Sequence, residues 1–149
     1  MLVVAGDWTK ISAISALSVS ARRKRWSLYL RLHPGRNIGA QQVAGFVRHL
    51  LRHIRGPIIL LWDRSRTHRA KIIQALLRRH RRIHPHFFPG YAPELNPDEF
   101  VWGLLKRATA NSVPKDLPHL KRLLQRPIRR LRRSQTLLRS CVHASDLPW

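Results

Sequence analysis

The sequence predicts an α/β fold, because the spacing of its apolar residues changes from the period of a strand to the period of a helix. Apolar and polar residues alternate over residues 26–33. Apolar residues then recur at helical spacing over residues 40–54. The short, continuous apolar run of residues 58–62 suits a strand buried on both faces. We therefore expect a sheet covered by helices.

Composition favours a single nucleic-acid-binding domain. The chain has 149 residues, enough for one domain with a core, and 44% of them are hydrophobic, which excludes a disordered basic tail. Lysine and arginine number 29 against 7 acidic residues, for a net charge of +22. This excess indicates a polyanionic partner, most simply nucleic acid, although a ribosomal-type binder or a membrane-surface protein would share it. The single cysteine, Cys141, excludes a disulfide framework and fits a reducing cytosol. No apolar run approaches transmembrane length.

The first half of the chain predicts a hairpin, a helix and a buried strand. Residues 10–19 roughly alternate and pair with residues 26–33 across a basic turn. A loop leads to the helix of residues 40–54, whose apolar stripe is broken after Ile54. Asp63 ends the strand that follows.

The second half predicts alternating helices and one further strand. Either Ser65 or Thr67 is expected to cap a helix with its apolar stripe over residues 72–77. Residues 83–88 form an edge strand, since Pro85 cannot donate to a ladder. The remaining expectations are a helix starting at Pro97 with Asn96 as N-cap, a basic helix over residues 116–131 that is kinked or restarted at Pro127, and a short helix capped by Ser134.

Two carboxylates stand out in so basic a chain. Asp63 ends a buried strand, where ligands bind in open α/β sheets, and Glu99 lies in the first turn of a helix. Each also has a purely structural interpretation. Asp63 suits a turn, and Asn96 with Glu99 is close to a capping box. One helix and one strand separate the two carboxylates, so the chain returns to the same end of the sheet.

A pair of carboxylates at one sheet end predicts a divalent-metal site. Hard oxygen ligands select Mg²⁺ or Mn²⁺, and two such ions support in-line phosphoryl transfer. Cations crowd the chain after Asp63, and they would hold a polynucleotide backbone: Arg64, Arg66, Arg69 and Lys71.

Two segments of the chain resemble one family. Trp62-Asp63-Arg64 with His68, followed by PGYAPELNPDEFVWGLLK over residues 89–106, resembles the DDE transposases of bacterial insertion sequences related to the mariner superfamily. The resemblance runs from about residue 10 to the C-terminus. It implies an RNase H-like mixed sheet flanked by helices, and metal-dependent DNA cleavage and strand transfer by a DDE endonuclease. The implied partner is DNA, and the implied location is the bacterial cytoplasm, at the nucleoid.

The resemblance also assigns roles to residues. It carries the catalytic, metal-binding roles onto Asp63 and Glu99, with His68 and Asn96 in support. It places DNA contacts at Lys106 and the adjacent Arg107. The cofactor it implies is Mg²⁺ or Mn²⁺ in a two-metal arrangement.

The family's first catalytic aspartate lies on a central strand that precedes the hairpin, and here the chain opens directly into the hairpin. Asp7 is the only acidic residue before Asp63, and it is not expected to be the missing ligand because no strand of the right type precedes it. We therefore expect residues 1–149 to form a single, partial catalytic domain without the first strand, with a basic helical region from about residue 112.

Such a chain would be a truncated gene product, or one part of a split transposase that works with an upstream fragment or as a homodimer. The alternative function is an inactive, basic DNA-binding remnant. A ribosome-associated structural protein would leave the sequence of residues 91–106 unexplained.

Zinc is not expected, although the chain has 9 histidines. His49 with His53, and His80 with His84, have a spacing that places each pair on one helix face, and His143 lies near Cys141. The sequence contains no HExxH motif and no paired CxxC motif. Most of these histidines are expected to add to the basic surface.

Overall fold

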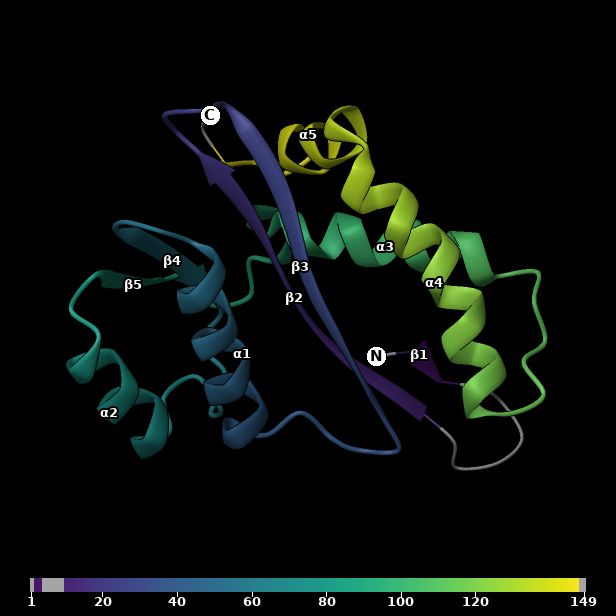
Figure 1. Ribbon diagram of the computed structural model, residues 1–149, viewed down its shortest axis with the longest axis horizontal. Helices are drawn as coiled ribbons and strands as arrows, with labels where there is room; N and C mark the ends of the chain where they lie inside the picture. The colour runs from purple at the N-terminus through teal and green to yellow at the C-terminus, as the bar shows by residue number, and fades with distance from the viewer. Residues whose placement is uncertain (1, 4–9, 148–149) are drawn as a thin grey trace. The chain divides into compact units, whose positions relative to one another are not determined.

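The computed structural model describes residues 2–3 and 10–147 and divides the chain into two compact units (Figure 1). One unit comprises residues 1–37 and 94–149, and the other comprises residues 38–93. Strands and helices occur in both units, which confirms the α/β class predicted from the sequence. The organisation as a single domain stays a prediction. None of the described helices is long and apolar enough to span a membrane.

The first unit is built on an antiparallel hairpin. Strands β2 (Lys10–Ser20) and β3 (Arg25–Pro34) pair along their whole length, with Leu17 opposite Leu28, and the short β1 (Leu2–Val3) pairs with the other edge of β2. Lys24 closes the turn between the two long strands at a φ of 46°. The predicted hairpin is therefore confirmed.

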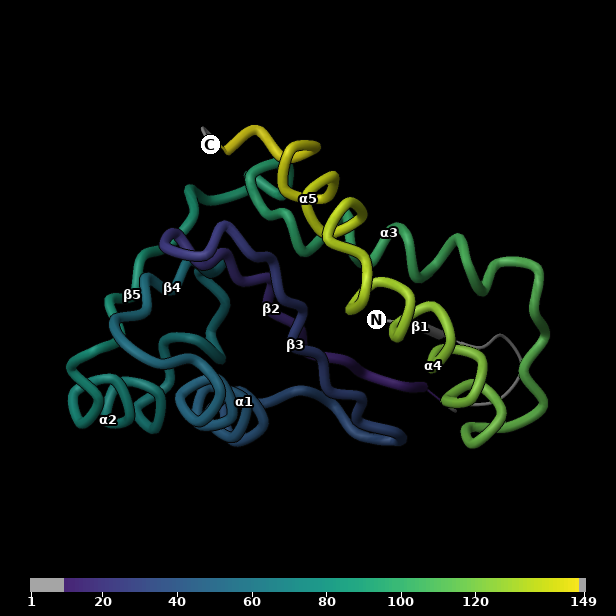
Figure 2. Tube along the Cα trace, turned by 45° about the horizontal axis from the view of Figure 1, so that its top comes forward, coloured from purple at the N-terminus to yellow at the C-terminus, as the bar shows by residue number. Residues whose placement is uncertain are grey.

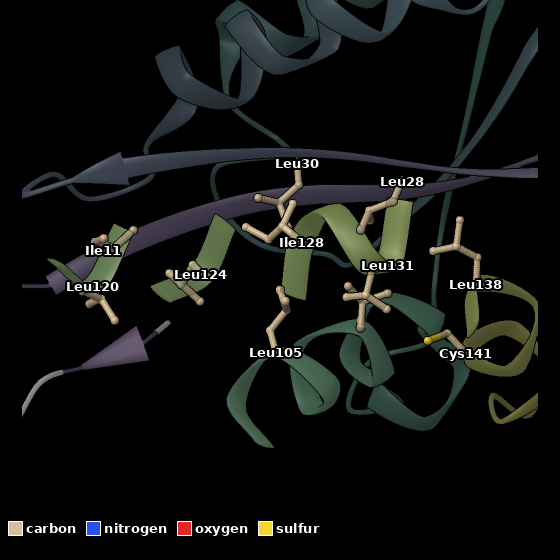
Figure 3. Packing of buried hydrophobic residues seen from close by; sticks show 11 residues of the cluster. Ile11, Leu28, Leu30, Leu105, Leu120, Leu124, Ile128, Leu131, Leu138 and Cys141 are labelled. Carbon is tan, nitrogen blue, oxygen red and sulfur yellow. The ribbon is translucent and has the colours of Figure 1, made fainter. Parts of the chain in front are cut away.

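Three helices pack against this hairpin: α3 (Pro97–Thr109), α4 (Leu117–Arg133) and α5 (Gln135–His143) (Figure 1). Figure 3 shows the core they form, which includes Leu30 of β3 and Ile128 of α4. The most deeply buried members of this core include Ile11, Leu105 and Leu124, whose exposure is 0%. Apolar area removed from water along these faces is the main stabilising contribution to the unit.

Side-chain caps begin the three helices, and those of α3 and α5 are the residues that the sequence predicts, Asn96 and Ser134. The Asn96 Oδ1 accepts a hydrogen bond from the Asp98 N–H at 3.1 Å. The Asp116 Oδ1 accepts one from the His119 N–H at 2.6 Å, and the Ser134 Oγ accepts one from the Leu137 N–H at 3.2 Å. Each cap satisfies one of the N–H groups that a helix start leaves unpaired.

Pro127 does not restart the helix, contrary to one expectation from the sequence. Helix α4 runs through it as one element from Leu117 to Arg133. Proline removes one backbone hydrogen bond. The buried residues on either side of it, Leu124 and Ile128, keep the two halves of the helix on the same core.

The second unit has a parallel pair of strands and two helices. Strands β4 (Ile58–Trp62) and β5 (Ile83–Phe87) pair in parallel, with Ile58 opposite Ile83 and Trp62 opposite Phe87. Helix α2 (Lys71–Arg79) connects them and lies beside α1 (Ala40–His53) (Figure 2). Parallel strands need such a crossover, and here it brings the chain back to the same end of the sheet.

Two expectations for this unit are wrong. Strand β4 is not buried on both faces, because Ile59 is 72% exposed and Leu61 is 42% exposed, whereas Ile58 and Trp62 are buried. Alternate side chains of a strand point to opposite faces, so only one face of β4 is covered. Neither Ser65 nor Thr67 caps α2, whose N-cap is Ala70. Instead, the two hydroxyl groups form a hydrogen bond with each other in the preceding turn, with their oxygens 2.8 Å apart.

Candidate carboxylate site and basic surface

Asp63 lies immediately after β4, at the carboxyl end of the parallel pair of strands. Its Oδ1 accepts a hydrogen bond from the Ser65 N–H at 2.8 Å, which closes a turn of the kind that aspartate favours. The side chain is nevertheless 63% exposed. The turn interpretation of Asp63 is therefore correct, and it leaves much of the carboxylate accessible.

His68 lies in the turn that precedes α2, and its side chain contacts Asp63. Its Nδ1 lies 2.8 Å from the Asp63 Oδ1 and 3.1 Å from the Asp63 carbonyl oxygen. Its ring stacks on the indole of Trp62 with centroids 4.6 Å apart and an interplanar angle of 11°. Trp62 in turn stacks on Phe87 of β5. Stacking on Trp62 at the end of β4 thus positions the His68 ring, and the His68 Nδ1 in turn positions one carboxylate oxygen of Asp63.

Glu99 lies in the first turn of α3, in the other unit. Its N–H donates to the Asn96 carbonyl at 3.1 Å, and Asn96 provides the helix cap. The capping-box interpretation fails, because the Glu99 carboxylate makes no hydrogen bond back to Asn96 among the described residues. The side chain is exposed. Asn96 therefore fixes the helix start, and the Glu99 carboxylate stays available.

Among the described carboxylates, Asp98 has the most perturbed environment, although its position in the sequence does not single it out. The Ser15 hydroxyl of β2 donates to its Oδ2, while its Oδ1 is shielded from solvent without a partner of ordinary hydrogen-bond geometry. Burial raises the pKa of Asp98 to about 6, while the Ser15 hydroxyl and the Trp102 indole favour the charged form and oppose the rise. Burial, followed by the charge of Asp98, also raises the pKa of the Cys141 thiol.

The structure brings some of the predicted site residues together. Asp63 and His68 are in contact within one unit, and Glu99 and Asn96 are adjacent within the other. Asp7 lies outside the described residues. Over residues 10–147, no group of three His, Cys, Asp or Glu side chains is arranged to hold a metal ion. As donors, the exposed oxygens of Asp63 and Glu99 are of the type that Mg²⁺ and Mn²⁺ prefer.

The predicted DNA-binding cations are all exposed: Arg64, Arg66, Arg69, Lys71, Lys106 and Arg107. The first four surround the turn between Asp63 and α2, and the last two lie in the last turn of α3. Among the described residues, none of them forms an ion pair.

The histidine pairs differ from one another. The rings of His49 and His53 lie 4.1 Å apart along α1. His80 is the C-cap of α2 and His84 lies in β5, so these two do not share a helix face.

Comparison with protein families identifies the class of this chain. The model of the DDE superfamily endonucleases matches residues 4–121. The match spans most of the chain, including both candidate carboxylates and the whole of the second unit. The chain belongs to the DDE superfamily endonucleases. No curated protein sequence matches it.

Solved structures agree on the fold. The catalytic domain of Mos1 mariner transposase is similar over 93% of this chain and 83% of that chain, with 16% sequence identity and a TM-score of 0.51. The same Mos1 domain solved with raltegravir and Mg is similar over 93% and 84%, with 15% identity and a TM-score of 0.51. A Mos1 paired-end complex with the left transposon end is similar over 93% and 55%, with 15% identity and a TM-score of 0.53. The chain therefore has the fold of this RNase H-like catalytic domain.

Proposed function

We propose that this chain carries two of the metal-binding carboxylates of a transposase that cleaves DNA and transfers its strands. The observation that carries the proposal is the environment of Asp63. In a chain of the DDE superfamily, this aspartate ends a parallel strand, is oriented through one oxygen by His68, and remains 63% exposed. Supporting evidence is the exposed Glu99 in the first turn of α3.

Asp63 and Glu99 are the residues that would hold a divalent cation, Mg²⁺ or Mn²⁺, and we propose the two-metal arrangement. Bound cations of this kind would make water, or a 3′-hydroxyl, a stronger nucleophile and would stabilise the charge on the leaving oxygen. The similar Mos1 catalytic domain has been solved with Mg and with Mn. His68 has a positioning role, because it holds the Asp63 Oδ1 and leaves the rest of the carboxylate accessible.

The exposed cations that follow Asp63, together with two at the end of α3, supply the substrate contacts in this proposal. Arg64, Arg66 and Arg69 follow Asp63 directly, and a guanidinium group binds phosphate through paired N–H donors. Lys71, Lys106 and Arg107 would add sequence-independent contacts. DNA is thus the substrate, and the protein would work in the bacterial cytoplasm at the nucleoid, as part of an insertion sequence.

A DDE site needs a third carboxylate, which we propose comes from an upstream transposase fragment. A homodimer is the second arrangement that would bring further carboxylates to the site. The competing function is metal-independent DNA binding by a chain that does not cleave.

A supercoiled-plasmid nicking assay with Mg²⁺ or Mn²⁺ tests the proposal. Mn²⁺ binding, and any cleavage that the chain supports alone or with the upstream fragment, should disappear in Asp63→Asn and in Glu99→Gln, and DNA binding measured in EDTA should persist in both. Glu94→Gln is the matched control, because Glu94 is an exposed glutamate on the same stretch of chain. The paramagnetic resonance of bound Mn²⁺ adds a readout that does not depend on turnover. Cleavage that both variants retain would refute the assignment. DNA binding without cleavage or Mn²⁺ binding in the unmodified chain would establish the remnant instead.

A further inference from the structure

Helix α4 divides sharply into an apolar side and an arginine side. Its buried residues are Leu120, Leu124, Ile128 and Leu131. At about 100° of rotation per residue they fall within about 80° around the helix axis. On the opposite side, five arginines fall within about 100°. We call them the α4 arginine face: Arg122, Arg126, Arg129, Arg130 and Arg133.

The α4 arginine face is exposed and has no acidic counterpart. All five arginines are exposed, and together with Gln125 they line one shallow hollow. Among the described residues, none of them forms an ion pair. Asp116, the acidic residue nearest to the helix in the sequence, is its N-cap, and its Oδ1 accepts a hydrogen bond from the His119 N–H. Like charges three and four residues apart destabilise a helix, so this arrangement costs stability unless an anion neutralises it.

A face that only kept the helix soluble would mix lysine, glutamate and other polar residues. Here every exposed charge from Arg122 to Arg133 is an arginine. Arginine is the cation whose planar fork of N–H donors matches phosphate. Arg132 shows the contrast within the same helix, because its guanidinium donates to the Leu30 carbonyl at 2.8 Å and ties α4 to β3. The α4 arginine face, in contrast, is exposed and accessible to a ligand outside the unit.

The length of the α4 arginine face indicates an extended ligand with many negative charges. Arg122 and Arg133 are eleven positions apart, about 16 Å along a helix. At about 3.4 Å per base pair, this distance spans about five base pairs of a duplex. A row of phosphates offers charge over that length, whereas a single small anion would engage only one turn of the helix.

We propose that the α4 arginine face binds the phosphate backbone of duplex DNA without reading its sequence. The choice of DNA over other polyanions rests on the proposed function. The binding itself needs neither metal nor the two carboxylates. The face would hold a donor or target duplex on the first unit, in addition to the cations near Asp63.

Salt-dependent binding tests the proposal. Fluorescence anisotropy with a 20-base-pair duplex, in EDTA and across a NaCl series, gives the slope of log K against log salt. Removing four phosphate contacts in Arg126→Gln/Arg129→Gln/Arg130→Gln/Arg133→Gln should make the slope shallower by about 3.6. The double variant Arg126→Gln/Arg129→Gln should change it by about 1.8. Replacing the four arginines with lysine should retain most of the slope.

The matched control removes four charges from the hairpin turn of the same unit: Arg22, Arg23, Lys24 and Arg25, each to Gln. It should change the slope by less than about 1. Equal losses in the two quadruple variants would show that binding follows net charge alone and would overturn the proposal. An unchanged slope in the α4 variants would overturn it as well. The binding assay contains EDTA and therefore does not depend on the metal site. If Asp63→Asn failed to abolish cleavage, the proposed function would be refuted, but the result of the binding assay would still stand.

Discussion

The Nδ1 of His68 lies 2.8 Å from the Oδ1 of Asp63, so one histidine nitrogen is committed to the candidate metal ligand. The same ring is stacked on Trp62, with centroids 4.6 Å apart. Stacking fixes the ring plane, and the hydrogen bond fixes the carboxylate. This arrangement separates two contributions of His68, packing and orientation, which variants can distinguish.

His68→Phe keeps a ring over Trp62 and removes the donor to Asp63. We expect it to lower Mn²⁺ affinity or cleavage by about 10- to 100-fold, as the loss of a residue that orients a metal ligand does. His68→Asn, which can still donate, should recover part of the loss. Mn²⁺ titration followed by paramagnetic resonance measures the first effect. Wild-type affinity in His68→Phe would mean that His68 only packs on Trp62 and that the Ser65 N–H alone positions Asp63.

The raised pKa of Asp98 predicts that the free energy of unfolding falls as the pH rises through the weakly acidic range. Its folded-state pKa is raised to about 6, above the value of an unfolded aspartate near 3.9. Between these values the folded state binds more protons than the unfolded state, so unfolding free energy decreases from about pH 4 to pH 6 and then levels off. The upper limit of the loss is about 3 kcal/mol.

Asp98→Asn removes this titration and should flatten the profile, giving a more stable protein than wild type above pH 6. Denaturant unfolding from pH 4 to pH 7 measures the difference between the two proteins. Asp116→Asn is the control, because asparagine caps a helix about as well as aspartate does and the Asp116 carboxylate is exposed. A wild-type profile that remains parallel to that of Asp98→Asn would show that the buried carboxylate does not titrate in this range.

Local signals explain what the sequence predicted well. Asn96 and Pro97 start α3, and Ser134 starts α5, because a cap and its helix are neighbours in the chain. The position of Asp63 at a strand end follows from the apolar run before it. These features need no knowledge of tertiary packing.

Contacts distant in the sequence account for the rest. Ser15 and Asp98 are 83 positions apart, and nothing near either residue indicates their contact. The exposure of Ile59 depends on which face of β4 is covered, which a continuous apolar run does not reveal. The N-cap of α2 was predicted wrongly because Ser65 and Thr67 bond to each other rather than to the helix.

Leu124 belongs to the first unit's core and has an exposure of 0%. Leu124→Ala should lower the free energy of unfolding by about 2–5 kcal/mol, through lost burial and the cavity left behind. Chemical denaturation followed by circular dichroism measures this loss. Val113→Ala is the control, because Val113 is 87% exposed and its truncation should stay within about 0.5 kcal/mol of wild type. A loss at Leu124 no larger than the loss at Val113 would contradict the described packing of α4.

In the second unit, the side chain of Arg82 donates hydrogen bonds to carbonyl groups at the end of α1 and just after it. Its Nη1 donates to the carbonyls of Ile54 at 2.7 Å and Gly56 at 2.8 Å, and its Nη2 donates to the carbonyl of Leu51. A cation at the C-terminus of α1 also meets the negative end of the helix dipole. Arg82→Ala leaves these carbonyls unpaired and should destabilise the unit by about 2 kcal/mol.

Hydrogen exchange at the end of α1 measures the effect of Arg82 locally. The Ile54 N–H, which donates to the Leu50 carbonyl at 2.8 Å, should lose protection by about 30-fold in Arg82→Ala. Arg82→Lys should recover only part of that protection, because an ammonium group lacks the fork that reaches several carbonyls at once. Arg81→Ala removes an exposed neighbouring charge and should leave exchange unchanged. Equal exchange in the Arg81 and Arg82 variants would show that charge, and not the three directed hydrogen bonds, holds α1 to the start of β5.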